Sequence, residues 1–258
     1  MGDSSLSNPA QIVGLIPARL ASTRLPDKPL IDIMGKPMLQ HVWERARAVH
    51  SFTDVAIATP DAKIRDCAEA FGATVVMTSS SHRSGTDRIA EAANVMGLDG
   101  RAIILNIQGD EPLLEPDGIE ALIAMMRADP TVPMASLMCP CPESEWNNPS
   151  CVKVVTAQNG QALYFSRARI PFPRNPNGPA VMQHIGLYGY RRSFLETYAT
   201  LGATPLETEE SLEQLRVLEH GFRIRMARVE AAPIGVDTPE DLENVRRILT
   251  DRMAGQVG

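Results

Sequence analysis

Three basic side chains occur within ten residues, directly after the first apolar run of the sequence. Arg19, Arg24 and Lys28 follow residues 12–16, a run typical of a buried strand. Open α/β sheets place ligands in the loops at the carboxyl ends of their strands. A triphosphate needs such cations, with backbone N–H groups as further donors. We therefore predict a phosphate-binding loop, in which Ala18 also contacts substrate; a solvated basic loop is the alternative.

Two acids at distant positions could hold a divalent cation. Asp110 follows the apolar run 102–107, where a carboxylate can project over the sheet edge and coordinate Mg²⁺, although Gly-Asp also favours a plain turn. One Asp rarely fixes Mg²⁺ well enough for catalysis, so a second carboxylate is expected. Asp237 is the candidate. Its position before Thr238 and Pro239 also fits a helix N-cap, which is the alternative.

A polar turn at residues 81–88 precedes a predicted helix. Its small residues, Ser84 and Gly85, would let a flat base lie close to the backbone, and we assign both to substrate binding. A capping box is the alternative, but Asp87 follows Thr86 directly and does not complete one.

Two later segments carry groups suited to sugar hydroxyls. Gly186 and Gly189 lie within a predicted strand and would allow a close approach. Glu213 and Gln214 place hydrogen-bonding groups on the polar side of a predicted helix. His184 begins the strand, but a lone His on a strand is often structural, which is the alternative there.

The elements that must position these residues alternate in the first half of the chain. Apolar runs and helical periodicity indicate βα units around a largely parallel sheet. Strands are predicted at 12–16, 55–59, 74–77, 102–107 and 134–138, with helices at 37–49, 61–72, 86–96 and 116–127. From 139 onward, prolines and shorter strands indicate antiparallel structure. Strands are predicted there at 152–156, 162–166 and 184–190, with helices at 207–220 and 239–253.

Composition excludes several classes of protein. The chain has 258 residues and a net charge of −6, which argues against a nucleic-acid binder. Residues 1–11 form a polar leader without the apolar segment of a signal peptide, and no run of about 18 apolar residues predicts a membrane span. The four cysteines fit reduced thiols of a cytoplasmic protein; Cys139 and Cys141 indicate loop or strand-end thiols rather than a metal site. We expect a single domain over 12–258.

Together these motifs closely resemble the 3-deoxy-manno-octulosonate (Kdo) cytidylyltransferase family, also called CMP-Kdo synthetases, from Val13 to about Ile248. Seven stretches match in the family's order, which makes the resemblance specific: 16–30, 82–88, 108–112, 162–167, 184–191, 212–218 and 235–242. It implies an α/β nucleotide-diphospho-sugar transferase fold. Such a fold has a Rossmann-like mixed, mostly parallel sheet flanked by helices, with a smaller antiparallel part for sugar binding and dimerisation.

The resemblance also implies roles for individual residues. CTP would bind to the half 12–138, and Kdo and the dimer contact would fall to 139–258. Arg19 and Lys28 would contact the CTP phosphates, Asp110 and Asp237 would hold Mg²⁺, and Arg24 would serve the sugar acid or the phosphates. The positions that line the family's sugar pocket are Gln108, His184, Tyr188, Glu213 and Gln214.

The implied activity is transfer of CMP from CTP to Kdo with release of pyrophosphate, in a cytoplasmic homodimer that supplies lipopolysaccharide synthesis. The substrates would be CTP and Kdo, with no nucleic-acid or membrane partner. Two alternatives stay open. One is a cytidylyltransferase for another acidic sugar, 8-amino-Kdo or sialic acid. The other is a non-catalytic nucleotide-binding module, against which the presence of both Asp110 and Asp237 argues.

Overall fold

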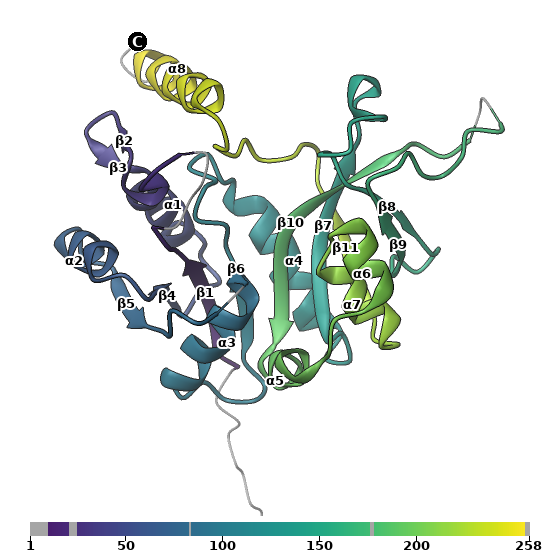
Figure 1. Ribbon diagram of the computed structural model, residues 1–258, viewed down its shortest axis with the longest axis horizontal. Coiled ribbons are helices and arrows are strands. Elements are labelled where there is room, and N and C mark those ends of the chain that lie inside the picture. Colours follow the sequence, from purple (N-terminus) through teal and green to yellow (C-terminus); the bar gives the residue numbers. More distant parts are fainter. Residues whose placement is uncertain (1–9, 21–24, 83, 176–177, 256–258) are drawn as a thin grey trace, which may run out of the picture.

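Four parallel strands form one side of a nine-stranded sheet (Figure 1). The computed structural model describes residues 10–20, 25–82, 84–175 and 178–255. β1 (Ile12–Pro17) lies between β6 (Ile103–Asn106) and β4 (Asp54–Thr59), and β5 (Thr74–Met77) pairs with β4. The loops that carry the predicted phosphate-binding residues and Asp110 therefore leave neighbouring strands at the same sheet edge.

Antiparallel pairing begins on the other side of β6. The long strand β10 (Met182–Arg191) runs antiparallel to both β6 and β7 (Met134–Pro140), while β11 (Ile224–Arg228) is parallel to β7. β8 (Lys153–Thr156) and β9 (Ala162–Ser166) form an antiparallel ribbon that extends from β10. The predicted mixed α/β fold is confirmed.

Helices cover both faces of this sheet, and alternate residues of β1 show why. Ile12 and Ile16 belong to one buried cluster, while Val13 and Leu15 belong to another on the opposite face. The first cluster is covered by α1 (Met38–Arg47), α2 (Ala62–Ala70) and α4 (Pro116–Ala128). The second is covered by α3 (Gly85–Val95), α5 (Arg192–Thr200) and α7 (Gln214–Glu219). Burial on both faces explains the continuous apolar runs of the parallel strands.

The C-terminal helix α8 (Pro239–Gly255) packs against the N-terminal part of the chain. It lies beside the small hairpin of β2 (Asp32–Ile33) and β3 (Lys36–Pro37) (Figure 1). Leu242 and Val245 of α8 share a buried cluster with Met38 and with Val236, which lies just before the helix. This packing brings the segment that contains Asp237 back to the N-terminal part of the chain. In the described part of the chain, no helix is long and apolar enough to cross a membrane.

The prediction of one helix over 207–220 was wrong. The chain instead forms α6 (Pro205–Glu210) and α7, because Ser211 adopts a left-handed conformation with φ 51° that ends α6. Besides the short hairpin β2–β3, α5 and β11 were not predicted. In β11 buried Ile224 and Met226 alternate with more exposed Arg225 and Ala227, and the strand ends at the exposed Arg228, which interrupts the apolar pattern. β7 also continues through Pro140, beyond the predicted end at 138.

Candidate active site

The two predicted acids meet at one ammonium group. Lys28 Nζ lies 2.7 Å from Asp110 Oδ2 and 3.0 Å from Asp237 Oδ1. Burial lowers the pKa of Lys28, but attraction and hydrogen bonds from Asp110 and Asp237 outweigh that effect, so its pKa is raised and the amine is charged. The carboxylates thus create a point of negative potential that already attracts a cation.

Backbone contacts fix Asp237 beside Asp110. The amide of Val236 donates to the carbonyl oxygen of Asp110 at 2.9 Å, and the Val236 side chain is fully buried. The capping that the sequence allowed Asp237 to perform falls to Thr238. Its Oγ1 accepts from the amide of Asp241 at 3.2 Å, while Asp241 Oδ2 accepts from the amides of Asp237 and Thr238. This cap orients the start of α8, and the Asp237 carboxylate contacts Lys28.

The loop after β1 carries Arg19 to the same sheet edge. The amide of Ala18 donates to the carbonyl of Ala58 at 2.9 Å, and the amide of Leu20 donates to Asp61 Oδ2 at 2.8 Å. These two contacts hold the backbone on either side of Arg19, whose side chain is exposed. An exposed, charged side chain on an anchored loop suits an anion that arrives from solvent. Arg24, predicted to contact the sugar acid or the phosphates, lies outside the described residues.

A pocket of about 280 Å³ includes Gln108, two residues before Asp110, in its lining. Of the predicted residues, Gln108, Tyr188, Glu213, Gln214 and Gly85 line it. They come from segments far apart in the sequence, and the fold brings them together. Gly186, where the sequence allowed a close approach, also lines it. The lining residues that we had not assigned to the site are Thr86, Asn106, Met134, Tyr190, Tyr198, Ser211 and Leu212.

The pocket wall contains buried polar atoms that lack partners. Gln108 Nε2 donates to the carbonyl of Gly186 at 2.8 Å, and the Tyr188 hydroxyl donates to Gln214 Oε1 at 3.3 Å. Within the described residues, Asn106 Oδ1 and Gln214 Nε2 have no hydrogen-bond partner although both atoms are buried. Leaving a buried donor or acceptor unpaired costs about 1–3 kcal/mol. One free acceptor and one free donor in a polar pocket fit a ligand with hydroxyl groups.

Asn106 carried a signal in the sequence, because it is the polar end of an otherwise apolar strand. It is 3% exposed at the end of β6, opposite Tyr188 of β10. A buried amide at such a strand end needs a partner. Tyr198 offered no such signal, since it lies in the helix α5, which was not predicted.

Glu213 and Tyr188 have shifted pKa values. Although the Glu213 side chain is reached by solvent, enclosure by the pocket walls raises its pKa, while Arg216 opposes that rise. Burial likewise raises the pKa of the Tyr188 phenol, with a further contribution from Glu213. Tyr188 is therefore a neutral hydrogen-bonding group at the pocket wall.

His184 lies behind the pocket rather than on its surface. It is 8% exposed, and its ring packs 4.9 Å from Phe165 and 5.5 Å from Tyr188, measured between centroids. Its Nε2 lies 2.9 Å from the Ser136 hydroxyl, and burial lowers its pKa to about 3, so the ring is neutral. In this position His184 supports Tyr188 through packing.

Ser84 is the N-cap of α3. Its Oγ accepts from the amide of Asp87 at 3.1 Å. The helix therefore begins at Gly85, whereas the predicted start was Thr86. The cap is this single bond from the Asp87 amide to Ser84, three residues earlier in the chain. Gly85 and Thr86 line the pocket, while the Ser84 hydroxyl fixes their backbone.

Comparisons with known proteins agree with this geometry. A family model described as Cytidylyltransferase matches residues 13–225. A 3-deoxy-manno-octulosonate cytidylyltransferase from Syntrophobacter fumaroxidans is 48% identical over 95% of this chain and 99% of its own length. One from Escherichia coli is 44% identical over 95% of this chain and 98% of its own.

Solved structures give the same result. The structure of CMP:2-keto-3-deoxy-manno-octonic acid synthetase complexed with CTP has a TM-score of 0.91 and 44% identity, covering 94% of this chain and all of that one. A 4-diphosphocytidyl-2C-methyl-D-erythritol synthase has a TM-score of 0.65 at 16% identity, which shows a shared fold alone.

The fold, the cluster of Lys28 with two acids and the family match together define a nucleotidyltransferase: the chain belongs to the cytidylyltransferase family. Within that family it belongs with the 3-deoxy-manno-octulosonate cytidylyltransferases, which it matches over nearly their whole length.

Proposed function

We propose that this protein transfers CMP from CTP to 3-deoxy-D-manno-octulosonate, giving CMP-Kdo and pyrophosphate. The observation that carries this proposal is the meeting of Asp110 and Asp237 at Lys28, with Asp110 two residues after Gln108, which lines the pocket together with Glu213 and Gln214. Full-length relatives that carry this enzyme name support the choice of both substrates, as does the similar structure that contains CTP.

In the proposed reaction, a hydroxyl of Kdo attacks the α-phosphorus of CTP in line, and the bond to pyrophosphate breaks. Such transfers depend on positioning and charge neutralisation more than on covalent catalysis. Arg19 and Lys28 neutralise the departing pyrophosphate from the anchored loop after β1. The neutral amide and phenol groups of the pocket orient the sugar. Transfer is direct, without an enzyme-bound intermediate.

Magnesium is the proposed cofactor, and the donor set fits it. Asp110 and Asp237 supply two oxygen ligands that point at one position, where the Lys28 ammonium lies. Mg²⁺ prefers one or two carboxylates together with phosphate and water oxygens. When bound, it would supply charge stabilisation to the phosphates. Lys28 would then exchange its carboxylate contacts for phosphate contacts.

The pocket suits a polyhydroxylated sugar. Tyr188, Gln214 and Asn106 present uncharged hydrogen-bonding groups, and the unpaired atoms on Asn106 and Gln214 match one donor and one acceptor of a hydroxyl-rich ligand. Glu213 adds a carboxylate, which accepts hydrogen bonds from hydroxyl groups. The Kdo carboxylate would be directed away from Glu213 and toward the cations of the loop after β1.

We further propose that the protein works as a cytoplasmic homodimer that activates Kdo for lipopolysaccharide synthesis. The resemblance of the chain to its family supports this. Sedimentation equilibrium at micromolar concentration should give twice the mass of the 258-residue chain; a mass of one chain at all concentrations would contradict the dimer.

The test of the function is product analysis with panels of nucleotides and acidic sugars. With CTP, Kdo and Mg²⁺ we expect CMP-Kdo and pyrophosphate in equal amounts, and much lower rates with UTP or GTP. Faster conversion of 8-amino-Kdo or sialic acid would overturn the sugar assignment. Binding of CTP, with no release of its pyrophosphate in the presence of any sugar tested, would instead favour a non-catalytic module.

A further inference from the structure

The pocket residues 211–214 lie where α6 ends and α7 begins, and both helices are too short to be stable alone. α6 and α7 each have six residues, whereas isolated helices shorter than about 12 residues are marginal in water. Ser211 between them has a left-handed backbone, which costs energy for a residue other than glycine. The position of Glu213 and Gln214 in the pocket therefore depends on contacts that hold α6 against α7.

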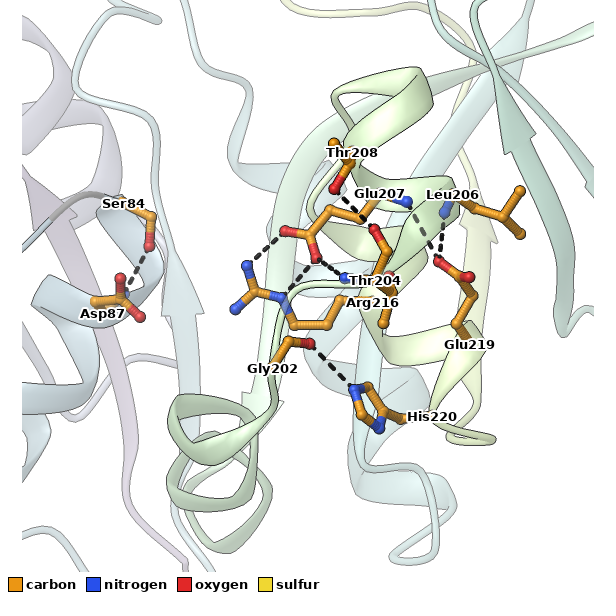
Figure 2. Close-up of polar contacts among 10 residues, drawn as sticks. All are labelled: Ser84, Asp87, Gly202, Thr204, Leu206, Glu207, Thr208, Arg216, Glu219 and His220. Atoms are coloured by element: carbon orange, nitrogen blue, oxygen red, sulfur yellow. Dashed lines mark hydrogen bonds and ion pairs between the residues drawn. The ribbon is translucent and has the colours of Figure 1, made fainter.

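Figure 2 shows those contacts, with Ser84 and Asp87 at the start of α3 drawn to their left. Arg216 of α7 binds Glu207 of α6 through two parallel hydrogen bonds, from Nε at 2.8 Å and from Nη2. Both side chains are largely buried, with 19% and 11% of their surface exposed. Bidentate Arg–carboxylate pairs are strong and geometrically specific.

A second contact completes the clamp between α6 and α7, which consists of Glu207, Arg216 and Glu219. Glu219 of α7 accepts hydrogen bonds at Oε2 from the amides of Leu206 and Glu207, at 3.0 and 3.2 Å. It thereby satisfies amide groups in the first turn of α6, where a carboxylate is favoured. Glu207 Oε2 in turn accepts from the amide of Thr204 at 3.2 Å. Arg216 and Glu219 of α7 thus hold α6, and Glu207 of α6 holds α7 through Arg216.

Arg216 also reaches the pocket itself. Its guanidinium carbon lies 5.3 Å from the centroid of the Tyr198 ring, and Tyr198 lines the pocket. A guanidinium over an aromatic face is attracted to it. Arg216 therefore joins Glu207, which holds the helix pair, to Tyr198, which forms part of the pocket wall.

We propose that Arg216, held by Glu207, is a positioning residue that sets the sugar side of the pocket and thereby the affinity for the acceptor, with no contact to the nucleotide. This inference rests on the proposed function for the identity of the acceptor. The clamp lies on α6 and α7. The residues proposed to bind the phosphates and the metal lie elsewhere, in the loops after β1 and β6 and just before α8.

The charges around Glu213 give this proposal a readout that packing alone would not move. Burial raises the pKa of Glu213, Arg216 lowers it, Asp87 of α3 and Glu207 of α6 raise it, and a hydrogen bond with Tyr198 of α5 lowers it. Removing the Arg216 charge should raise the pKa of Glu213 further. If the Glu213 carboxylate accepts hydrogen bonds from the sugar, the acid limb of kcat/KM for Kdo should move to higher pH.

Steady-state kinetics of Arg216→Met, with CTP and Kdo varied in turn, test the proposal. We expect KM for Kdo to rise at least tenfold while KM for CTP changes less than twofold, and the acid limb to move to higher pH. Arg216→Lys keeps the charge without the two parallel bonds, so it should restore the pH profile and part of the affinity. Arg65→Met is the matched control, because Arg65 forms an exposed pair with Asp66 on α2.

Equal changes in both KM values, or an unchanged KM for Kdo, would overturn the proposal. Should Arg216→Met fail to fold, Glu207→Gln tests the same clamp: KM for Kdo should rise without an upward shift of the acid limb, because a negative charge near Glu213 is removed.

Amide hydrogen exchange separates this inference from the proposed function. In Arg216→Met, exchange in residues 205–219 should be at least tenfold faster than in the unaltered protein, with β6 unchanged. Unaltered exchange there would contradict the clamp. If the unaltered protein makes no CMP-Kdo, the proposed function fails, while the exchange result still decides whether the clamp exists.

Discussion

Lys28 holds a position that a divalent cation would also favour. Its ammonium lies within 3.0 Å of both carboxylates. In Lys28→Met the two acids would lose this competing charge, so Mn²⁺, used in place of Mg²⁺, should bind about tenfold more tightly, since charged hydrogen bonds are worth about 1.5–3 kcal/mol. Turnover should nevertheless fall about 100-fold, because a cation that neutralises the phosphates is lost.

Calorimetric titration with Mn²⁺, paired with a pyrophosphate-release assay, measures both effects. Lys36→Met, which removes an exposed partner of Glu44, is the control. Weaker Mn²⁺ binding in Lys28→Met would show that Lys28 organises the two acids rather than competes with a metal.

At the residue scale, chemistry could be predicted where unusual residue types interrupt an apolar pattern. Gln108 and Asp110 follow a buried strand, and that position alone indicated a site. The sequence could not show that Lys28 joins the two acids, because that contact depends on how α8 packs. Nor could it place His184 behind the pocket, since strand periodicity gives the face of a residue but not its depth.

At the scale of elements, the cap of α8 and the proposed metal site share one short segment but use different residues. Thr238→Ala removes the hydroxyl that accepts from the Asp241 amide, so we expect a loss of about 1 kcal/mol in the free energy of unfolding. Urea denaturation monitored by circular dichroism measures this. Asp237→Ala is the comparison, and it should lower turnover much more than stability. A larger stability loss in Asp237→Ala than in Thr238→Ala would assign the cap to Asp237.

Two glycines of β10 have different roles. A Cβ at Gly189 would lie 2.6 Å from Met126 Sδ and 2.9 Å from Leu122 Cδ2 of α4, so Gly189→Ala should destabilise the fold by about 1–3 kcal/mol. The sequence predicted a close approach there, and the approaching group is a helix. A Cβ at Gly186 would meet no atom within 4 Å, and Gly186 lines the pocket, so Gly186→Ala should raise KM for Kdo with stability unchanged.

Thermal unfolding and steady-state kinetics on both alanine variants separate the two roles. Equal melting temperatures for the two variants would contradict the assignment of Gly189 to packing.

Elements with strong periodicity and clear punctuation were predictable. α4 begins at Pro116 and β1 at Ile12, as the sequence indicated. The break between α6 and α7 was not, because a serine at φ 51° carries no sequence signal and is held in place by the Glu207–Arg216 pair from either side of it. Tertiary contacts overrode a continuous helical pattern there.

At the scale of the whole molecule, the fold joins two distant parts of the chain at one site. β1 leads into the cationic loop, its neighbour β6 leads into Asp110, and the returning segment before α8 brings Asp237. The alternating pattern of strands and helices predicted the parallel sheet. It thereby also predicted that the loops after β1 and β6 lie at one edge of the sheet. The return of α8 to the β2–β3 hairpin depends on apolar contacts between distant residues, which local patterns do not encode.

The most direct test of the account is turnover in Asp110→Asn and Asp237→Asn, followed as pyrophosphate release with CTP, Kdo and Mg²⁺. Both side chains contact the Lys28 ammonium and are proposed to hold the same Mg²⁺. Each single variant should therefore lose at least about 100-fold in kcat, and the double variant should lose little more than the worse single variant. Circular dichroism should show an unaltered fold, and Asp66→Asn, at an exposed position on α2, should be fully active. Near-normal turnover in either site variant would contradict the claim that the two acids together hold the catalytic metal.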